Sequence, residues 1–218
     1  MPHFDKTQQL PIYQKAKFNK MYIVVEGNIG AGKTSLVHLL CERLGASPML
    51  EEFAENSFLP RFYENPEKFA FPLELSFLAA RFHQMNNVFN KTENQFIIAD
   101  YHFEKCKIFA SVNLPSLEFD LFSTFYDMMA EKLPKPDLIV FLNSDIERLE
   151  SNISLRGRSY EKTIGTSYLN KISEAYQGRI NTIKNQKTLI IKSSDLDFVN
   201  NTDHLNQIIR EVTFNFSM

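Results

Sequence analysis

Short, continuous apolar runs recur along the chain between longer segments of helical character. The runs are rich in Ile and Val and do not alternate with polar residues, which is typical of parallel strands buried on both faces. They are Met21–Glu26, Gln95–Asp100, Asp137–Leu142 and Thr188–Lys192, with Pro48–Glu51 as a weaker fifth. The pattern predicts an α/β fold with a five-stranded parallel sheet flanked by helices.

The segments between these runs carry the helical pattern. Phe69, Leu73, Phe77 and Ala80 are spaced to form one buried face of a long helix, and Pro72 predicts a bend or a break in it. We expect helices over residues 33–44, 66–89, 104–112, 117–132, 146–155, 167–184 and 204–213. No repeat, low-complexity tract or Gly/Ser linker occurs in the sequence, so residues 21–218 should form a single domain.

Length, composition and charge narrow the class of protein. A chain of 218 residues that is 44% apolar suits one domain. Residues 1–20 are polar and basic without an apolar core, which predicts a mobile N-terminal extension rather than a signal peptide, and no run approaches the ~20 apolar residues of a membrane span. Two distant cysteines favour free thiols in a reducing cytoplasm. A net charge of −2 without a basic block argues against binding of polymeric nucleic acid and favours a small-molecule substrate.

The strongest chemical signal lies between the first apolar run and the first helix. The sequence GNIGAGKT matches the pattern G-x-x-x-x-G-K-[ST] in its usual strand-to-helix context. Glycines let backbone N–H groups surround phosphate oxygens, and the following helix presents its positive end. We expect Lys33 to bridge the β- and γ-phosphates of ATP and the Thr34 hydroxyl to ligate Mg²⁺. The predicted nucleotide-binding residues are Gly27, Asn28, Ile29, Gly30, Ala31, Gly32, Lys33, Thr34 and Ser35.

Charged groups at two strand ends and on one loop suit phosphoryl transfer. Asp100 ends an apolar run and is a candidate Mg²⁺ ligand, with the N-cap of a helix as the alternative. Glu51 ends the weak strand, where a carboxylate can accept the proton of an attacking hydroxyl, although a solvated surface acid fits equally well. Arg156 and Arg158 lie on a short glycine-containing loop. We expect residues 156–165 to form a lid, with two solvated arginines as the alternative.

These groups together predict a P-loop kinase that moves the terminal phosphate of ATP to a small, nucleoside-like alcohol. One alternative is a nucleoside-monophosphate kinase, such as one acting on thymidylate. Such an enzyme needs arginines for the phosphate of its acceptor, where this chain has Glu51 and Tyr101. The other alternative is a non-catalytic nucleotide-binding module, for which Glu51 and the two lid arginines have no evident use.

Six stretches of the chain carry a resemblance more specific than the phosphate-binding loop alone. They are VEGNIGAGKTSL, LEEFAENSFLPRFYENP, FAFPLELSFLAAR, ADYHFEKCKIFA, LPKPDLIVFL and RGRSYEKTIGTSYL. From about Met21 to Val199 the chain resembles the deoxynucleoside kinase family, and it is most similar to a bacterial subgroup that includes deoxyguanosine kinases. The resemblance implies a cytoplasmic enzyme of nucleotide salvage that phosphorylates a deoxynucleoside 5′-hydroxyl with ATP and Mg²⁺. It also implies a homodimer formed by helix packing.

The resemblance implies roles for individual side chains. Glu51 is similar to the family's general base. Tyr63 and Glu161 resemble the pair that holds the sugar 3′-hydroxyl, and Phe109 resembles the aromatic ring that stacks on the base. Arg81 lies near a base-reading position of the family. Structural alternatives stay open: Phe109 as a core residue, Tyr63 as a helix-surface residue and Arg81 as an ion-pair partner.

Two departures from the family pattern remove positive charge. Tyr101 stands where many members have an arginine that touches the acceptor oxygen and phosphate. His102 is a candidate for partial replacement, although a lone histidine is more often a structural hydrogen-bonding group. Asn152 stands in place of a lid-helix arginine. We therefore expect Lys33, Mg²⁺ and the two lid arginines to carry more of the transition-state charge.

A third departure concerns Glu74, at a position where the family often reads the base with a glutamine. An ionised carboxylate only accepts hydrogen bonds, and the N1–H and N2–H₂ groups of guanine match both of its oxygens. Adenine presents one donor beside an acceptor, so it requires a protonated Glu74 or an intervening water. The sequence thus favours a purine 2′-deoxynucleoside, with deoxyguanosine ahead of deoxyadenosine.

Overall fold

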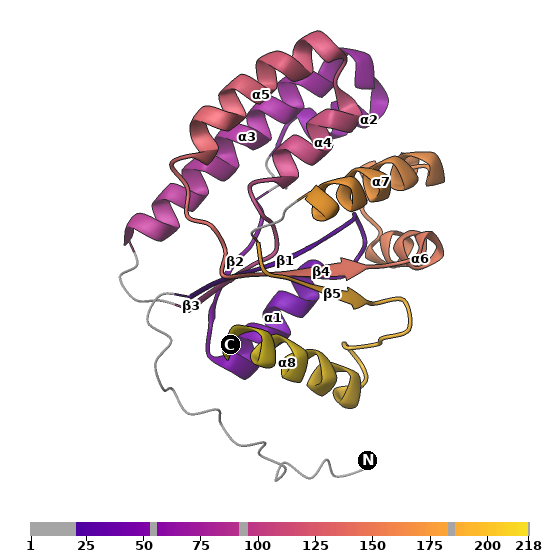
Figure 1. Ribbon diagram of the computed structural model, residues 1–218. Helices are drawn as coiled ribbons and strands as arrows, with labels where there is room; N and C mark the ends of the chain where they lie inside the picture. The colour runs from indigo at the N-terminus through magenta and orange to yellow at the C-terminus, as the bar shows by residue number, and fades with distance from the viewer. Residues whose placement is uncertain (1–20, 53–55, 92–95, 183–185, 218) are drawn as a thin grey trace.

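The computed structural model describes residues 21–52, 56–91, 96–182 and 186–217, and the extension predicted for residues 1–20 lies outside them. Five parallel strands form one sheet in the order β2-β3-β1-β4-β5 (Figure 1). The strands are β1 (Met21–Gly27), β2 (Ser47–Met49), β3 (Phe96–Ala99), β4 (Leu138–Asn143) and β5 (Thr188–Lys192). The predicted sheet is confirmed. Strand β2 ends earlier than expected, so Glu51 lies just beyond it.

The helical periodicity is borne out as well, because all seven predicted helices are present with ends that differ by a few residues at most. They are α1 (Lys33–Leu44), α3 (Pro66–Lys91), α4 (Lys105–Asn113), α5 (Ser116–Ala130), α6 (Ile146–Arg156), α7 (Thr166–Thr182) and α8 (Thr202–Ser217). Helix α2 (Phe58–Glu64) and the 3₁₀ helix η1 (Ser159–Thr163) are too short to show a helical period. Helix α3 continues through Pro72, so the predicted break there is wrong.

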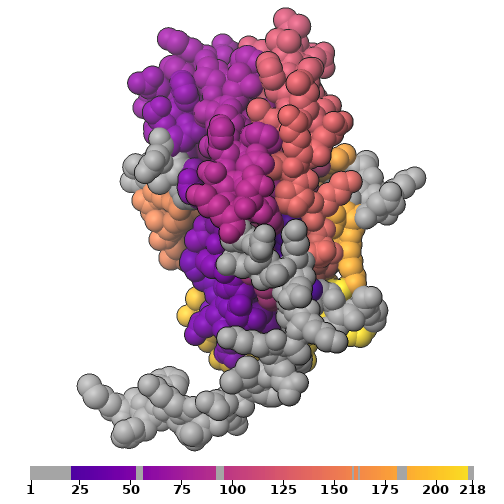
Figure 2. All heavy atoms as spheres, turned by 90° about the vertical axis from the view of Figure 1, so that its left-hand side faces the viewer, coloured from indigo at the N-terminus to yellow at the C-terminus, as the bar shows by residue number. Residues whose placement is uncertain are grey.

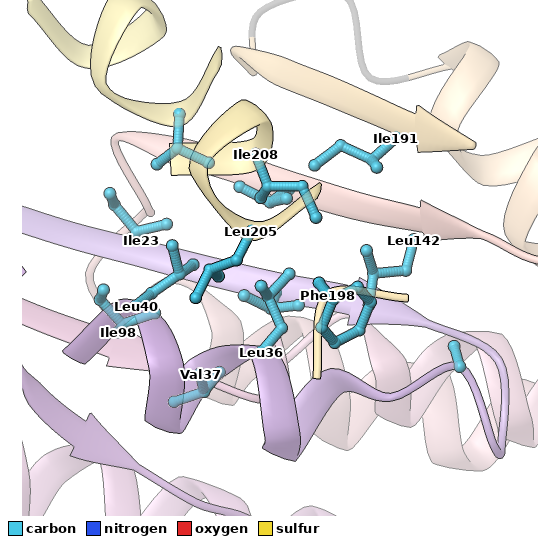
Figure 3. Packing of buried hydrophobic residues seen from close by; sticks show 14 of the residues in the cluster. Ile23, Leu36, Val37, Leu40, Ile98, Leu142, Ile191, Phe198, Leu205 and Ile208 are labelled. Atoms are coloured by element: carbon cyan, nitrogen blue, oxygen red, sulfur yellow. The ribbon is translucent and has the colours of Figure 1, made fainter. Parts of the chain in front are cut away.

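Two helical layers cover the sheet (Figure 1). Helices α1 and α8 pack on one face, where Ile23, Leu36, Leu142, Leu205 and Ile208 are almost completely buried and interdigitate (Figure 3). Each side chain of this kind contributes about 1.5–3 kcal/mol of transfer free energy. This layer holds α1, and with it the phosphate-binding loop, against the sheet.

The opposite face of the sheet carries a larger layer, built mainly from α3, α4 and α5. Its core is rich in aromatic side chains, among them Phe77, Tyr101 and Phe122. Helix α3 lies beside α5 on the outer side of this layer (Figure 2). In the part of the chain that the structure describes, no helix has both the length and the apolar character needed to cross a membrane.

The loop between β1 and α1 depends on glycine. Gly30 has φ +82°, in the left-handed region that other residues rarely adopt. A Cβ atom on Gly30 would lie 2.7 Å from the carbonyl oxygen of Leu149 in α6, which is too close for two non-bonded atoms. The loop therefore packs directly on α6, and Asn152 of the same helix donates a hydrogen bond to the Gly30 carbonyl oxygen (2.7 Å).

The carboxylate of Glu26 ties three elements together beneath this loop. Glu26 is 4% exposed, and its Oε2 accepts hydrogen bonds from the backbone N–H of Gly27 (3.1 Å) and the Tyr176 hydroxyl (2.8 Å). Its Oε1 accepts from the backbone N–H of His102 (2.6 Å). Because these donors come from the end of β1, from α7 and from the segment after β3, Glu26 fixes the edge of the sheet at which the chemistry is expected.

Candidate active site

A pocket, here the loop pocket, opens beside the phosphate-binding loop. Residues 30–35 line one side of it, and α6 and residues 196–199 line the other. Lys33 lies on its floor, where Nζ donates to the carbonyl oxygens of Gly27 (3.0 Å) and Asn28 (2.9 Å). Burial, together with repulsion from Lys105, lowers the pKa of Lys33 to about 8. A half-buried ammonium group held by carbonyl oxygens at a pocket wall is suited to receive an anionic phosphate.

The predicted nucleotide-binding residues divide into two groups. Gly30 to Ser35 line the loop pocket, whereas Ile29 faces the neighbouring pocket described below. Gly27 and Asn28 line neither pocket. The Asn28 amide donates to the Leu169 carbonyl oxygen (2.8 Å) and to the Ser173 hydroxyl (2.7 Å), so its side chain anchors the loop to α7.

Thr34 and Asp100 lie together, as predicted for Mg²⁺ ligands. The Thr34 hydroxyl donates to Oδ2 of Asp100 (2.5 Å), and Oδ1 accepts from the backbone N–H of Glu51 (2.7 Å). The alternative role of Asp100 as a helix N-cap is wrong, because the N-cap of α4 is Glu104. A hydroxyl and a carboxylate fit Mg²⁺, which uses one or two protein oxygens and completes its shell with phosphates and waters.

A second pocket, here the helix pocket, lies between α2, α3, α4, α7 and the lid. Its wall brings together all the side chains that the family resemblance assigns to the sugar and base, namely Tyr63, Glu74, Arg81, Phe109 and Glu161. The two pockets adjoin. The residues that line both are Gly30, Lys33, Thr34, Glu51, Asp100, Arg156 and Arg158. Every residue predicted to act on the transferred phosphate therefore lies at the junction of the pockets.

Glu51 is held at this junction by two cations. Arg81 donates to Oε1 through Nε (2.9 Å) and through a second guanidinium nitrogen, and Lys105 donates to Oε2 from Nζ (2.6 Å). Burial alone would raise the pKa of Glu51, but the charges and hydrogen bonds of Lys105 and Arg81 outweigh it and hold that pKa well below its usual range. The side chain is 11% exposed, so the alternative of a solvated surface acid is wrong.

Arg81 has the ion-pair role that was one of its two interpretations. Besides its bonds to Glu51, the guanidinium donates to the sulfur of Cys106 (3.1 Å) and lies over the ring of Phe77 at 4.7 Å from the centroid. Three of its nitrogens are therefore engaged with protein groups. In this geometry Arg81 binds and orients the Glu51 carboxylate. A direct contact between Arg81 and a base remains an expectation from the family resemblance.

Glu74 is buried in the wall of the helix pocket and only half satisfied. It is 2% exposed, and Oε1 accepts a hydrogen bond from the Asn113 amide (2.7 Å). Oε2 is buried without a hydrogen-bond partner among the described residues. Burial raises the pKa of Glu74 to about 7, although the Asn113 bond and the charges of Arg81 and Lys105 act in the opposite direction. An unsatisfied buried acceptor of this kind needs a physical reason, and a ligand group is one.

The lid folds back onto Glu161. This carboxylate accepts from Arg156 at Oε2 (2.9 and 2.6 Å) and from Arg158 at Oε1 (3.2 Å), and it is 6% exposed. Burial, together with the charge of Glu161, raises the pKa of the Tyr63 hydroxyl, which places the two groups near each other. Tyr63 also stacks against Tyr160 of the lid. The structure thus brings Tyr63, Glu161 and the lid arginines to one end of the helix pocket. Both arginines pair with Glu161 while their side chains stay 34% and 31% exposed, so their action on a phosphate stays a prediction.

Phe109 packs in the core and also lines the helix pocket, so it is compatible with both of its interpretations. Its ring lines the helix pocket and also meets the ring of Tyr176 edge-on, with centroids 6.4 Å apart. Lys105 Nζ lies 5.5 Å from its centroid. A half-buried ring in this position can support a planar group in the pocket while it packs against α7.

Lys105 and Asn113 line the helix pocket, and sequence reasoning missed them. The signal that could have found them is helical spacing: Phe109 lies one turn after Lys105 and one turn before Asn113, so all three share one face of α4. The expected substitute for the missing arginine, His102, lines neither pocket, and burial lowers the pKa of its imidazole. Tyr101 is buried and donates to Gln84 (2.6 Å). The compensation proposed for His102 is therefore wrong.

Comparisons with known proteins identify the family and the fold of this chain. The deoxynucleoside kinase model matches residues 23–216. A deoxyguanosine kinase of Bacillus subtilis is 33% identical over 198 residues, covering 88% of this chain and 95% of the relative, and a deoxyguanosine kinase of Lactobacillus acidophilus is 34% identical over 165 residues, covering 71% and 70%. A deoxyadenosine kinase structure from M. mycoides has the same fold, with a TM-score of 0.79 at 23% identity, and covers 89% of this chain and 100% of its own. The chain belongs to the deoxynucleoside kinase family.

Proposed function

We propose that this chain uses ATP and Mg²⁺ to phosphorylate the 5′-hydroxyl of purine 2′-deoxynucleosides, deoxyguanosine ahead of deoxyadenosine, in cytoplasmic nucleotide salvage. The observation that carries the activity is that Lys33, Glu51 and the two lid arginines line both of the adjoining pockets. The unpartnered Oε2 of Glu74 supports the order of the purines. Oε2 is an open acceptor, and Oε1 can accept a second hydrogen bond beside the one from Asn113, so the carboxylate can receive the two adjacent donors of guanine. Relatives named deoxyguanosine kinase at 33% and 34% identity support the order, beside a deoxyadenosine kinase at 29%.

Within this proposal, each end of the site has its own task. ATP lies in the loop pocket with its terminal phosphate at the junction, and the nucleoside lies in the helix pocket with its 5′-hydroxyl toward Glu51. Thr34 and Asp100 would hold Mg²⁺, which would supply positive charge for the phosphates. Lys33 binds the transferred group from the loop side, and the lid arginines close over it.

Glu51 acts on the hydroxyl as an ionised acceptor. Its low pKa keeps it charged at all working pH values, so it orients the hydroxyl by a hydrogen bond before reaction. The same low basicity means that the proton moves late, when the bond to the leaving oxygen has largely broken. That order suits the loose transition state of phosphoryl transfer.

A panel of acceptors tests the proposed activity. With ATP and Mg²⁺ we expect kcat/KM to fall in the order deoxyguanosine, deoxyadenosine, then the two pyrimidine deoxynucleosides, because only guanine supplies two adjacent donors to Glu74. Thymidine monophosphate serves as the control acceptor and should not be phosphorylated. A preference for a pyrimidine would contradict the proposed substrate, and lack of turnover with all four nucleosides would contradict the activity.

Replacement of Glu51 tests the acceptor role. Glu51→Ala should lower kcat by about 10²–10⁴, the usual scale for loss of a general base, while the Kd of ATP changes by less than about threefold. Glu52→Ala is the matched control, since Glu52 is exposed and lines neither pocket. Steady-state kinetics and calorimetry measure the two quantities. A kcat near that of wild type in Glu51→Ala would remove Glu51 from the role.

The protonation state of Glu74 should set the choice between purines. Above a pH of about 7 the ionised carboxylate accepts from both guanine donors, whereas below it the acid donates to adenine N1 while its other oxygen accepts from N6. The ratio of kcat/KM for deoxyguanosine over deoxyadenosine should therefore rise as the pH increases through this value. Glu74→Gln should remove that pH dependence and shift the ratio roughly tenfold toward adenine, the scale of one misplaced buried hydrogen bond. Glu67→Gln, on the exposed first turn of α3, is the control, and a ratio unchanged in Glu74→Gln would show that Glu74 does not read the base.

We also propose a homodimer that packs α5 against its copy. Leu117, Leu121, Phe125 and Met128 recur at helical spacing on α5 and are between 49% and 74% exposed. A stripe of large apolar side chains on one helix face is typical of a protein interface. It agrees with the helix-packed dimer that the family resemblance implies.

Charge placed on this stripe tests the dimer. Phe125→Lys should convert a dimer to a monomer, because a dimer would bury the lysine in an apolar interface. Phe214→Lys in α8 is the control, since Phe214 is also exposed but lies in the layer on the other face of the sheet. Size-exclusion chromatography with light scattering measures the mass. A monomeric wild-type protein, or a Phe125→Lys variant that stays dimeric, would contradict the proposal.

A further inference from the structure

Lys105 is a buried cation in the site, and the catalytic roles described above do not explain its position. Lys105 begins α4, and its side chain is only 9% exposed. It lines the helix pocket next to Glu51, with Nζ 2.6 Å from Oε2 of that carboxylate. Burial of an ammonium group is costly unless its charge is used, so the position calls for a reason beyond packing.

Neutralising Glu51 does not require Lys105. Arg81 already matches the charge of Glu51 through two nitrogens on Oε1, and its third bond goes to the sulfur of Cys106. Lys105 therefore adds a second positive charge to a carboxylate that one guanidinium satisfies. The group of Glu51, Arg81 and Lys105 carries a net positive charge at the acceptor side of the junction.

A third cation stands across the junction. Lys33 lines both pockets and Lys105 lines the helix pocket, so two ammonium groups border the space where the pockets meet and repel each other. An anion placed between them would relieve this repulsion and bind to both. The transferred phosphoryl group passes through that position in the proposed reaction.

We propose that Lys105 is a catalytic residue that binds the transferred phosphoryl group from the nucleoside side, in place of the arginine missing at Tyr101. The inference rests on the proposed function. The flexible stem of Lys105 lets Nζ move from Glu51 Oε2 to a phosphoryl oxygen, which frees Oε2 for the 5′-hydroxyl. The 5′-oxygen forms the new bond to phosphorus, and the bond from phosphorus to the β–γ bridging oxygen breaks. ADP leaves with that electron pair, Glu51 takes the hydroxyl proton, and Lys105 stays protonated.

Neutral variants of Lys105 test the catalytic role. Lys105→Met should lower kcat by about 10²-fold, the scale for loss of one transition-state donor, while Lys105→Arg should retain kcat within about tenfold because it keeps the charge. Lys107→Met is the matched control: it lies on the same helix, pairs with Asp127 and lines neither of the two catalytic pockets. Lys105→Gln replaces Lys105→Met if the latter does not fold, as judged by circular dichroism.

Binding affinities measured without turnover distinguish two roles of Lys105: direct contact with a phosphate group, and positioning of Glu51. With the deoxynucleoside that wild type prefers and its 5′-monophosphate, calorimetry in the absence of ATP and Mg²⁺ gives two Kd values. Lys105→Met should weaken the monophosphate at least about tenfold and the nucleoside less than about threefold, since only the monophosphate brings an anion to Lys105.

The same measurement in a Glu51→Gln background decides between direct and indirect action. A further tenfold loss of monophosphate affinity on adding Lys105→Met supports direct contact, because Glu51 is then no longer a carboxylate to be held. No further loss would overturn the inference and make Lys105 a positioning residue for Glu51. A wild-type enzyme that phosphorylates a deoxynucleoside, with kcat and monophosphate affinity unchanged in Lys105→Met, would overturn the inference alone. A wild type without such turnover would overturn the proposed function instead.

Discussion

The position of the Glu51 carboxylate between Arg81 and Lys105 is the constraint on which the rest of the site depends. Glu51 follows a short edge strand, and its backbone N–H donates to Asp100, so the end of β3 fixes its main chain. Its side chain is then fixed by cations from α3 and α4. An acid held by three elements cannot turn away from the junction of the pockets, which gives an attacking alcohol one direction of approach toward the triphosphate.

The sequence predicted the parts of this molecule that depend on local pattern. The five strands and seven helices follow from apolar runs and periodicity, because helical layers bury the central strands on both faces while each helix buries one face. The phosphate-binding loop was equally predictable, since its glycine pattern reflects the backbone geometry. Gly30 has a positive φ, and no space is available there for a Cβ atom. Helix α2 and η1 were missed because seven and five residues are too few to establish a period.

The site was harder to predict where partners come from distant parts of the chain. Glu51 and Arg81 were each named, but they lie 30 positions apart in the sequence, and no local pattern predicts their ion pair. Lys105 was missed because a lysine on a helix is usually solvated, and only its spacing from Phe109 places it on the inner face. His102 was given a charge-bearing role because it follows the departure at Tyr101, although burial disfavours its charged form. Packing between distant segments of the chain determines which charged side chains are buried in the site, and a single sequence does not show that packing.

In the proposed function, the choice of base depends on a buried acceptor that no protein group among the described residues satisfies. A buried acceptor without a donor costs about 1–3 kcal/mol, and Glu74 keeps one such oxygen in the wall of the helix pocket. Asn113 satisfies the other oxygen and fixes the plane of the carboxyl group, so the open acceptor has a defined direction. A base that brings a donor to this oxygen recovers the cost, whereas a base with an acceptor there adds repulsion. Helix α4 supplies both Asn113, which binds Glu74, and Lys105, which binds Glu51. In the proposed function, this one rigid element would tie recognition of the base to the position of the reacting hydroxyl.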